Sequence, residues 1–500
     1  MNKMYVLDAA HMRSADEGTI EEIGIPQEVL MERAALAVKD AVLKYSPTRV
    51  LCVCGGGNNG GDAVAVARIL VMQGVSADVY LCTQTEKQKE SVKKQYDIFR
   101  KIGGRTVTDT DFSEYDMIVD GIFGVGLDRD VKENYAEIIR AINRASQNGS
   151  KVIAVDIPSG INTDTGTVMG VAVKADETVS FAYHKPGHLL YPGAEYCGRV
   201  TVRDIGIRVD YLYDKTKPQA FTVSANEAIS LPPRKRDGNK GTFGRILIIA
   251  GSREMYGACY LSALAAFRMG AGLVDIYTHE INRQIMQEKL PEAILHTYAE
   301  DGMNEELLCK MLHRADCVVI GPGLSTDENA AMLVSAVLNN CTKTIVADAD
   351  ALNCISKDKT LLDTQKTFPE REIIITPHPG EFSGLTGQSI SELKSNYADA
   401  VNAFAKEYRL IVVGKDAGTV VSDGKQTYFN QSGNDGMATA GSGDVLSGVI
   451  GALCASGMAG FEAAWNGVFI HGKAGDVAVK TSNTRSVMAS DIANAIKEIL

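Results

Sequence analysis

Short apolar runs that end in glycine-rich or polar segments recur along this chain and alternate with stretches of helical spacing. Continuous apolar runs of this length are typical of strands buried on both faces of a parallel sheet. The pattern therefore predicts a doubly wound α/β architecture throughout. In the first half it predicts strands near 49–54, 77–82, 116–120, 151–157 and 177–182, and helices near 62–73, 86–101 and 133–146. In the second half it predicts strands within 244–252 and at 318–320, 345–347, 373–375 and 410–413.

A polar, proline-containing segment divides the chain. We place the boundary at 210–231, immediately before Pro232 and Pro233. We therefore expect one domain over 1–215 and a second over 225–500. The length agrees, because 500 residues are too many for a single core.

Composition and charge exclude several classes of protein. The formal net charge of −11 argues against a nucleic-acid partner. No apolar run is long enough to span a membrane, and the N-terminal segment lacks a signal-peptide core. The 10 cysteines show no paired spacing, which is typical of reduced thiols. We expect a cytoplasmic, homo-oligomeric protein with no membrane partner.

The segment 440–448 carries the most informative motif of the chain. Small residues at Gly441, Ser442 and Gly443 let backbone N–H groups turn toward an anion. The helix that begins near Asp444 adds its positive N-terminal end, and Asp444 adds a carboxylate. A phosphoryl-transfer enzyme needs this pairing of anion donors with a base for the attacking hydroxyl. The alternative is an aspartate that caps a helix after a glycine-rich turn.

Polar residues follow the other apolar runs of the second half. Gly323, His378 and Lys415 each lie just beyond such a run. In parallel sheets, ligands bind beyond the carboxyl ends of the strands. One crevice should therefore collect these residues together with Asp444.

The first half has its own glycine-rich segment. The run 55–62 follows a predicted strand and precedes a predicted helix, which is the geometry of a phosphate cradle. A plain glycine-rich turn between strand and helix is the alternative. Asp120 and Asp156 each end an apolar strand. A buried charge there destabilises the fold unless it is paired with another group or serves to bind a ligand.

Together, the motifs of the second half resemble the ADP/ATP-dependent NAD(P)H-hydrate dehydratase domain, a branch of the ribokinase-like superfamily, over roughly 225–500. The motifs are 321–323, 378–381, 415–419, 434–439 and 441–444. Asp435 and Ala440 depart from the usual proline and glycine of the family.

This resemblance implies that Asp444 is the base that activates the hydroxyl of a hydrated nicotinamide ring, in NADHX or NADPHX. Phosphorylation would turn the hydroxyl into a leaving group, and elimination would restore the dihydropyridine. ADP or ATP would be the co-substrate, with Mg²⁺. The implied nucleotide contacts are Lys415, Asp416, Ala417, Gly418, Thr419, Gly441, Ser442 and Gly443. The implied substrate contacts are Ala258, Gly323, His378 and Asp444.

The segments 58–62 and 156–160, with predicted helices around 10–13 and 30–34, look like the NAD(P)H-hydrate epimerase domain, a Rossmann-like fold, over roughly 1–215. Ala63 departs from the usual glycine. The resemblance implies that the dinucleotide is held by Asn58, Asn59, Gly60, Gly61, Asp62, Gly124, Val125, Gly126, Leu127, Asp128, Arg129 and Asp130. Asp156 is our candidate for acid–base work at the ring.

Asn59, Asp120 and Ser159 form a candidate cation site. Their oxygen atoms suit a large monovalent ion better than Mg²⁺, and the family implies K⁺. Hydrogen bonding among the three loops is the alternative.

The two halves together resemble the bifunctional NAD(P)H-hydrate repair enzymes. Two other classes stay open. A ribokinase-like kinase of a vitamin or other small alcohol would explain Asp444 but not the first domain. A non-catalytic Rossmann-like binding module would be indicated by loss of Asp120 or Asp156, and both are present.

Overall fold

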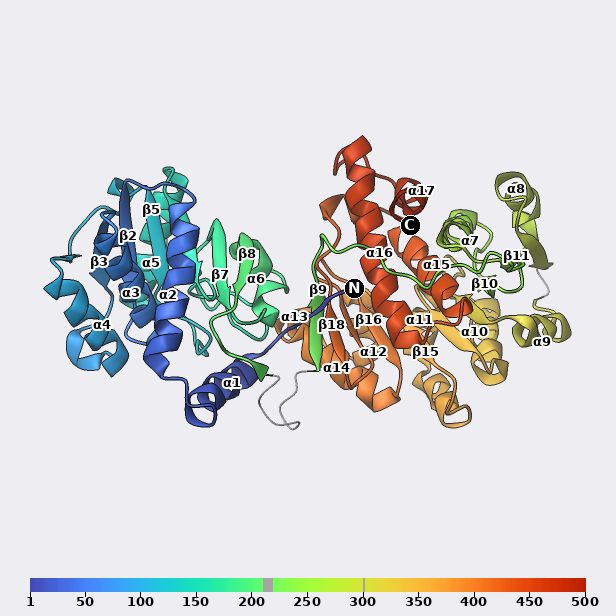
Figure 1. Ribbon diagram of the computed structural model, residues 1–500. Helices are drawn as coiled ribbons and strands as arrows, with labels where there is room; N and C mark the ends of the chain where they lie inside the picture. The colour runs from blue at the N-terminus through green and yellow to red at the C-terminus, as the bar shows by residue number, and fades with distance from the viewer. Residues whose placement is uncertain (210–218, 300–301) are drawn as a thin grey trace. The chain divides into compact units, whose positions relative to one another are not determined.

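The computed structural model describes residues 1–209, 219–299 and 302–500 (Figure 1). The chain forms two compact units, Met4–Ala220 and Phe221–Leu500, and Met1–Lys3 belongs with the second of these. Part of the predicted boundary, 210–218, lies outside the described residues.

A 7-stranded sheet forms the centre of Met4–Ala220, in the order β4-β3-β2-β5-β6-β7-β8. Neighbouring strands are parallel throughout. The chain moves outward from β2 in one direction and returns to β5 on the other side, which is the Rossmann order with its switch point between β2 and β5. The predicted α/β class is confirmed for this unit. The strands are β2 (Arg49–Cys54), β3 (Ser76–Leu81), β4 (Arg105–Val107), β5 (Met117–Gly121), β6 (Lys151–Val155), β7 (Glu177–Phe181) and β8 (Arg199–Arg203).

Helices cover both faces of this sheet, because alternate residues of each strand point to opposite sides. Val50 and Cys52 pack in one apolar cluster with α2 and α3, whereas Leu51 and Val53 pack in another with α5. The helices are α1 (Ala9–Glu21), α2 (Gln27–Leu43), α3 (Asn58–Met72), α4 (Glu90–Lys101), α5 (Glu133–Gln147) and α6 (Gly193–Tyr196), with short 3₁₀ turns η1 (Thr85–Lys87), η2 (Phe112–Glu114) and η3 (Pro186–His188).

The helix α3 begins at Asn58, earlier than the predicted start at 62. The glycines that indicated a loop lie in its first turn. A Cβ on Gly60 would lie 2.0 Å from the carbonyl oxygen of Gly55. These glycines therefore allow the first turn to pack against the end of β2, rather than break the helix.

The second unit contains an 11-stranded sheet in the order β1-β9-β18-β17-β16-β15-β14-β13-β10-β11-β12. The strands from β12 to β16 are parallel, whereas β16, β17 and β18 pair antiparallel. The strands are β1 (Lys3–Tyr5), β9 (Ala220–Val223), β10 (Arg245–Ile249), β11 (Leu273–His279), β12 (Ile294–Tyr298), β13 (Cys317–Ile320), β14 (Thr344–Ala347), β15 (Ile373–Ile375), β16 (Ile411–Gly414), β17 (Val420–Ser422) and β18 (Thr427–Phe429). The parallel strands predicted for this half are confirmed.

The central helix of this unit is α15, whose residues from Val445 to Ala455 are all buried. It packs with α7, α16 and α17 on the sheet (Figure 1). A Cβ on Gly448 would lie 2.1 Å from the carbonyl oxygen of Ser262, so glycine lets α15 and α7 approach closely. The helices are α7 (Tyr256–Met269), α8 (Arg283–Lys289), α9 (Glu305–Arg314), α10 (Glu328–Asn340), α11 (Asp350–Lys357), α12 (Pro379–Thr386), α13 (Ile390–Ser395), α14 (Tyr397–Tyr408), α15 (Ser442–Ala455), α16 (Gly460–Thr481) and α17 (Ala489–Ile499), with 3₁₀ turns η6 (Glu280–Asn282), η7 (Lys359–Lys366) and η8 (Asp435–Met437). Among the described residues, no helix has the length and apolar character needed to cross a bilayer.

Candidate active sites

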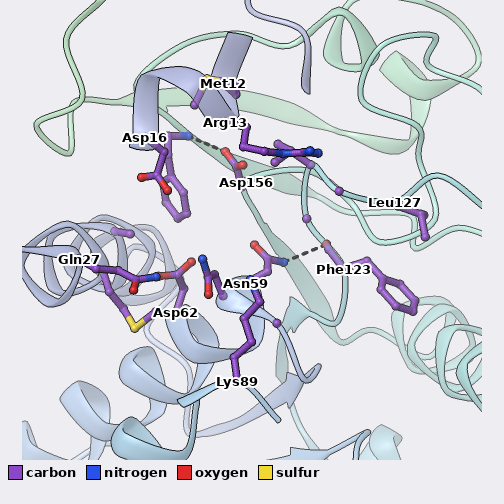
Figure 2. A pocket seen from close by; sticks show the side chains of 18 of the residues that line it. Met12, Arg13, Asp16, Gln27, Asn59, Asp62, Lys89, Phe123, Leu127 and Asp156 are labelled. Atoms are coloured by element: carbon purple, nitrogen blue, oxygen red, sulfur yellow. Dashed lines mark hydrogen bonds between the residues drawn. The ribbon is translucent and has the colours of Figure 1, made fainter. Parts of the chain in front are cut away.

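A cavity of about 940 Å³ opens beyond the carboxyl ends of β2, β5 and β6 in the first unit (Figure 2). This position is the switch point of the sheet, where doubly wound folds bind their ligands. The volume lies within the range of small-molecule sites. Residues from α1 and α2 complete the wall, among them Met12, Asp16 and Met31.

The structure brings most of the predicted dinucleotide-binding residues to this cavity. Those that line it are Asn58, Asn59, Asp62, Gly124, Val125, Gly126, Leu127, Asp128, Arg129 and Asp156. Gly60, Gly61 and Asp130 do not line it. A Cβ on Gly61 would lie 2.8 Å from the Met31 side chain, so this glycine makes room for a residue of the wall.

The three predicted cation ligands converge around Phe123. The Ser159 hydroxyl donates to Asp120 Oδ1 at 2.6 Å, and the Ser159 N–H donates to Asp120 Oδ2 at 2.8 Å. The Asn59 amide donates to the carbonyl oxygen of Phe123 at 2.9 Å, and the Phe123 N–H donates to Ser159 Oγ at 2.9 Å. Burial raises the pKa of Asp120 to about 6, although the hydrogen bonds from Ser159 oppose this shift. Carboxylate, hydroxyl and carbonyl oxygens therefore occur close together, and Asn59 reaches them through its amide nitrogen.

Asp156 follows β6 with a φ of +66°, a conformation that is unfavourable for most residues other than glycine. Its carboxylate accepts a hydrogen bond from the Phe181 N–H at 2.9 Å and forms an ion pair with Lys185. His188 Nε2 lies 2.9 Å from the Asp156 carbonyl oxygen. Contacts on both the backbone and the side chain thus hold this residue in an unusual conformation at the cavity wall.

Sequence reasoning missed Lys185, which is 0% exposed. Burial lowers the pKa of Lys185, whereas the carboxylate of Asp156 opposes this shift. The signal that pointed to Asp120 and Asp156 is absent here, because Lys185 lies four residues beyond β7, a strand that contains Glu177, Thr178 and Ser180.

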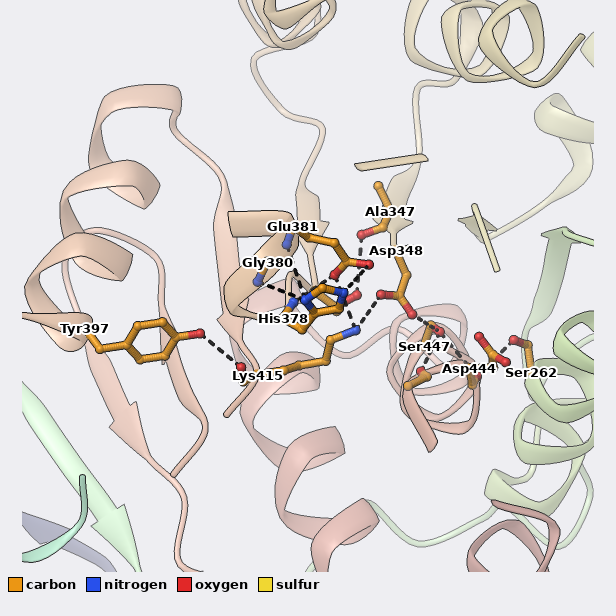
Figure 3. Close-up of polar contacts among 12 residues, drawn as sticks. Ser262, Ala347, Asp348, His378, Gly380, Glu381, Tyr397, Lys415, Asp444 and Ser447 are labelled. Atoms are coloured by element: carbon orange, nitrogen blue, oxygen red, sulfur yellow. Dashed lines mark hydrogen bonds and ion pairs between the residues drawn. The ribbon is translucent and has the colours of Figure 1, made fainter. Parts of the chain in front are cut away.

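In the second unit, Lys415 lies at the centre of a polar cluster (Figure 3). Its Nζ atom lies 2.8 Å from Asp348 Oδ1 and 3.9 Å from Glu381 Oε2. Ser447 on α15 donates to Asp348 Oδ2 at 3.0 Å. Burial by itself lowers the pKa of Lys415, but Asp348 and Glu381 raise it above its usual value. Lys415 is therefore a fixed cation, and the sequence analysis did not select its two carboxylate partners, Asp348 and Glu381.

The predicted anion hole lies at the start of α15. Gly441 has a φ of +88°, and a Cβ there would lie 2.4 Å from Leu261 Cδ1, so only glycine fits. Within the described part of the chain, no side chain caps α15. A Cβ on Gly443 would lie 3.2 Å from Lys415 Nζ, which places this cation beside the first turn. Backbone donors, a helix N-terminus and a lysine thus meet at one point.

Asp444 lies in the first turn of α15, beside this hole. Burial and the neighbouring carboxylate of Asp348 together raise the pKa of Asp444 to about 7, against the effect of Lys415. A general base is most effective when its pKa lies near the working pH. The position and the pKa of Asp444 therefore both suit a base.

The remaining predicted residues occupy the same edge of the sheet. His378 precedes α12, and its Nδ1 accepts from the Gly380 N–H at 3.0 Å. A Cβ on Gly323 would lie 2.9 Å from the Cβ of Ala258, so these two predicted substrate contacts are neighbours. The loop after β16 contains Asp416, Ala417, Gly418 and Thr419, and Asp416 forms an ion pair with Lys394 at 3.3 Å.

Comparison with known proteins gives matches for both units. A family model described as NAD(P)H-hydrate dehydratase matches residues 246–498, and one described as YjeF-related protein N-terminus matches residues 27–187. The bifunctional NAD(P)H-hydrate repair enzyme Nnr of Thermofilum pendens is 35% identical, over 99% of this chain and 96% of its own length. The enzyme of the same name from Moorella thermoacetica is also 35% identical, over 99% of this chain and 97% of its own length.

Among solved structures, the ADP/ATP-dependent NAD(P)H-hydrate dehydratase of Bacillus subtilis, co-crystallised with ATP and Mg²⁺, matches 54% of this chain and 93% of its own. The two are 29% identical, with a TM-score of 0.47.

Proposed function

This chain belongs to the family of bifunctional NAD(P)H-hydrate repair enzymes, and from the geometry of its two sites we propose what it does. It interconverts the R and S epimers of hydrated NADH and NADPH, and it dehydrates the S epimer with ADP or ATP. The observation that carries the proposal is the base Asp444 beside the uncapped helix start and Lys415. A cytoplasmic location and a homo-oligomeric state stay predictions.

In dehydration, Asp444 accepts the proton of the ring hydroxyl while the hydroxyl oxygen attacks the terminal phosphorus of the nucleotide. The backbone N–H groups of 441–443 and the charge of Lys415 offset the negative charge that develops on the phosphoryl oxygens. The phosphorylated oxygen then leaves as phosphate, and loss of a proton from the adjacent ring carbon restores the double bond.

The carboxylates of Asp348 and Glu381 are the oxygen donors that fit Mg²⁺ at this site, since that ion is usually held by one or two carboxylates together with substrate phosphates. When bound, the ion neutralises the phosphates of the nucleotide.

The test uses the full chain and each purified epimer of hydrated NADH. With ADP or ATP, both epimers should be consumed and the dihydronicotinamide absorbance should return. Without a nucleotide, the epimers should equilibrate and no absorbance should appear. Phosphorylation of a small alcohol, with both hydrated dinucleotides left untouched, would instead support the kinase alternative.

The rate of dehydration should rise with pH and level off above about pH 7, because Asp444 must be ionised to accept the proton. Below that pH, kcat/KM should fall about tenfold per pH unit. Asp348→Asn should move the inflection to lower pH, since loss of the like charge lowers the pKa of Asp444. Dehydration rates of the S epimer with ADP, measured across the pH range for the wild type and for Asp348→Asn, give the two inflection points. A profile independent of pH would contradict the assignment of Asp444.

In the epimerase site, Asn59, Asp120 and Ser159 would hold K⁺, together with the carbonyl oxygen of Phe123. The donor set fits, because one carboxylate and several neutral oxygens suit a large monovalent ion better than Mg²⁺. When bound, the ion adds positive charge beside the loop that follows β5.

K⁺ should therefore raise the unfolding temperature of the first unit, or its epimerase rate, above the value in Na⁺ at equal ionic strength. An ion present at a hundredfold excess over its Kd stabilises the folded state by about 2.7 kcal/mol. Asp120→Ala should abolish the difference between the two salts. Thermal unfolding of the wild type and the variant in each salt is the measurement, and an indifferent wild type would exclude the site.

A further inference from the structure

The carboxyl group of Asp62 has an unusual environment. Asp62 lies in the first turn of α3, is 8% exposed and lines the cavity of the first unit. Across the described ranges of the chain, no hydrogen bond or ion pair reaches its carboxyl oxygens. The carboxyls of Asp156 and Asp16 act on it through their charge, and Arg13, Lys89 and Arg129 also line the cavity. Figure 2 shows the three carboxyl groups around one cavity, on separate elements.

Such an environment favours the protonated form of a carboxyl group. Burial raises the pKa of Asp62 well above its usual value, and Asp156 and Asp16 raise it further. An ionised carboxylate buried without a cation or a donor is very costly. In its neutral form, Asp62 carries an O–H group that can donate a hydrogen bond or a proton into the cavity. Such an O–H group suits a hydroxyl of the substrate.

Asp156 lies in the opposite environment. Lys185, which is buried beneath it, forms an ion pair with its carboxylate, and the Phe181 N–H donates a hydrogen bond to the same oxygen. Among the residues that the structure describes, the carboxyl oxygens of Asp62 have neither kind of partner. Two carboxyl groups that share a site but differ in this way are typical of an acid and a base that work together.

We propose that Asp62 is a second catalytic residue of the epimerase site, a neutral acid that protonates the substrate while Asp156, paired with Lys185, accepts a proton. The inference rests on the proposed epimerase function and adds the proton donor that a single base does not supply.

The step applies to a ring whose hydroxyl carbon adjoins the ring nitrogen, as when water has added to an enamine. Asp62 gives its proton to the hydroxyl oxygen, the C–O bond breaks, and its electron pair leaves with the oxygen as water. The nitrogen lone pair forms a C=N bond, which makes the carbon planar. Water adds from the other face, the C=N pair returns to nitrogen, and Asp156 takes the proton of the incoming water. The proton returns from Asp156 to Asp62 through water in the cavity.

The test compares Asp62→Asn with the wild-type full chain. The amide has nearly the same shape and still donates a hydrogen bond, but it cannot transfer a proton. The kcat of epimerisation should fall at least about 100-fold, the lower range for general acid catalysis, with little change in KM. Asp16→Asn is the matched control, because it removes a charge from the same cavity and should cause a much smaller loss.

Two outcomes of this comparison overturn the inference. One is a variant that keeps the wild-type kcat. The other is a variant in which only KM rises, since Asp62 would then only bind the substrate. Dehydration of the S epimer, which takes place in the other unit, should be retained by Asp62→Asn and serves as the internal control for the protein preparation.

Two further measurements use only the wild-type protein, so they do not depend on whether a variant folds. Epimerisation in ¹⁸O-labelled water should place the label in the hydroxyl, and retention of the original oxygen would overturn the C–O step. The epimerisation rate should also fall at high pH as Asp62 loses its proton. The profile is set by Asp62, Asp16 and Asp156, with Lys185 and His188 beside Asp156 and with Arg13 and Lys89 in the cavity wall. A rate that stays constant at high pH would overturn the inference. A wild type that does not interconvert the epimers at all would refute the proposed function itself.

Discussion

Replacing Asp444 with asparagine should abolish nucleotide-dependent dehydration. The amide has nearly the same volume as the carboxyl group and keeps the start of α15 intact, but it cannot accept the hydroxyl proton. General bases contribute about 10²–10⁴-fold to rates, so the loss should be at least 100-fold. The measurement is the return of dihydronicotinamide absorbance from the S epimer with ADP. Epimerisation should be unchanged, because its site lies in the other unit.

The control for this prediction is Asp350→Asn. Asp350 begins α11 and also raises the pKa of Asp444, but its carboxylate is engaged by the Ser325 N–H at 2.9 Å. This substitution removes a nearby charge without removing the base, so dehydration should persist. Equal dehydration rates in Asp444→Asn and the wild type would contradict the role of Asp444 as the base.

Asp156→Asn should stop interconversion of the epimers, again by at least about 100-fold. Asparagine tolerates the positive φ at this position better than most residues, so the local backbone should persist. The substitution also leaves Lys185 buried without a counter-charge. Removal of one partner of a buried ion pair costs about 3–5 kcal/mol, and the first unit should therefore unfold at a lower temperature. Epimer ratios over time and a thermal unfolding curve measure the two effects.

The two effects can be separated by the double variant Asp156→Asn, Lys185→Met. Because it removes both charges and keeps an unbranched apolar side chain, it should recover much of the lost stability. It should not recover epimerisation, since no base is restored. If Asp156→Asn alone epimerises at the wild-type rate, Asp156 has only a structural role at the end of β6.

Several features of this protein follow from the sequence by itself. The alternation of apolar runs with helical spacing predicts the parallel strands of both units, because the period of a strand or helix is a local property. The position of the predicted anion hole is local as well. Gly441, Gly443 and Asp444 are neighbours in the chain, and the helix that follows them brings its own N-terminal donors.

The start of α3 shows where local reasoning fails. Glycine ordinarily indicates a loop, but Gly60 lies in a helical turn because the carbonyl oxygen of Gly55 leaves no room for a side chain. That contact depends on how the helix returns onto the sheet. The composition of the segment does not contain this information.

The ionic partners were decided by the tertiary structure alone. Lys185 contacts Asp156, which is 29 residues away along the chain, and Lys415 contacts Asp348, which is 67 residues away. The raised pKa of Asp62 likewise depends on burial and on carboxyls supplied by other elements. A strand end can be predicted to carry a functional charge, but the pKa of that charge is set by neighbours in space, and only folding brings those neighbours together.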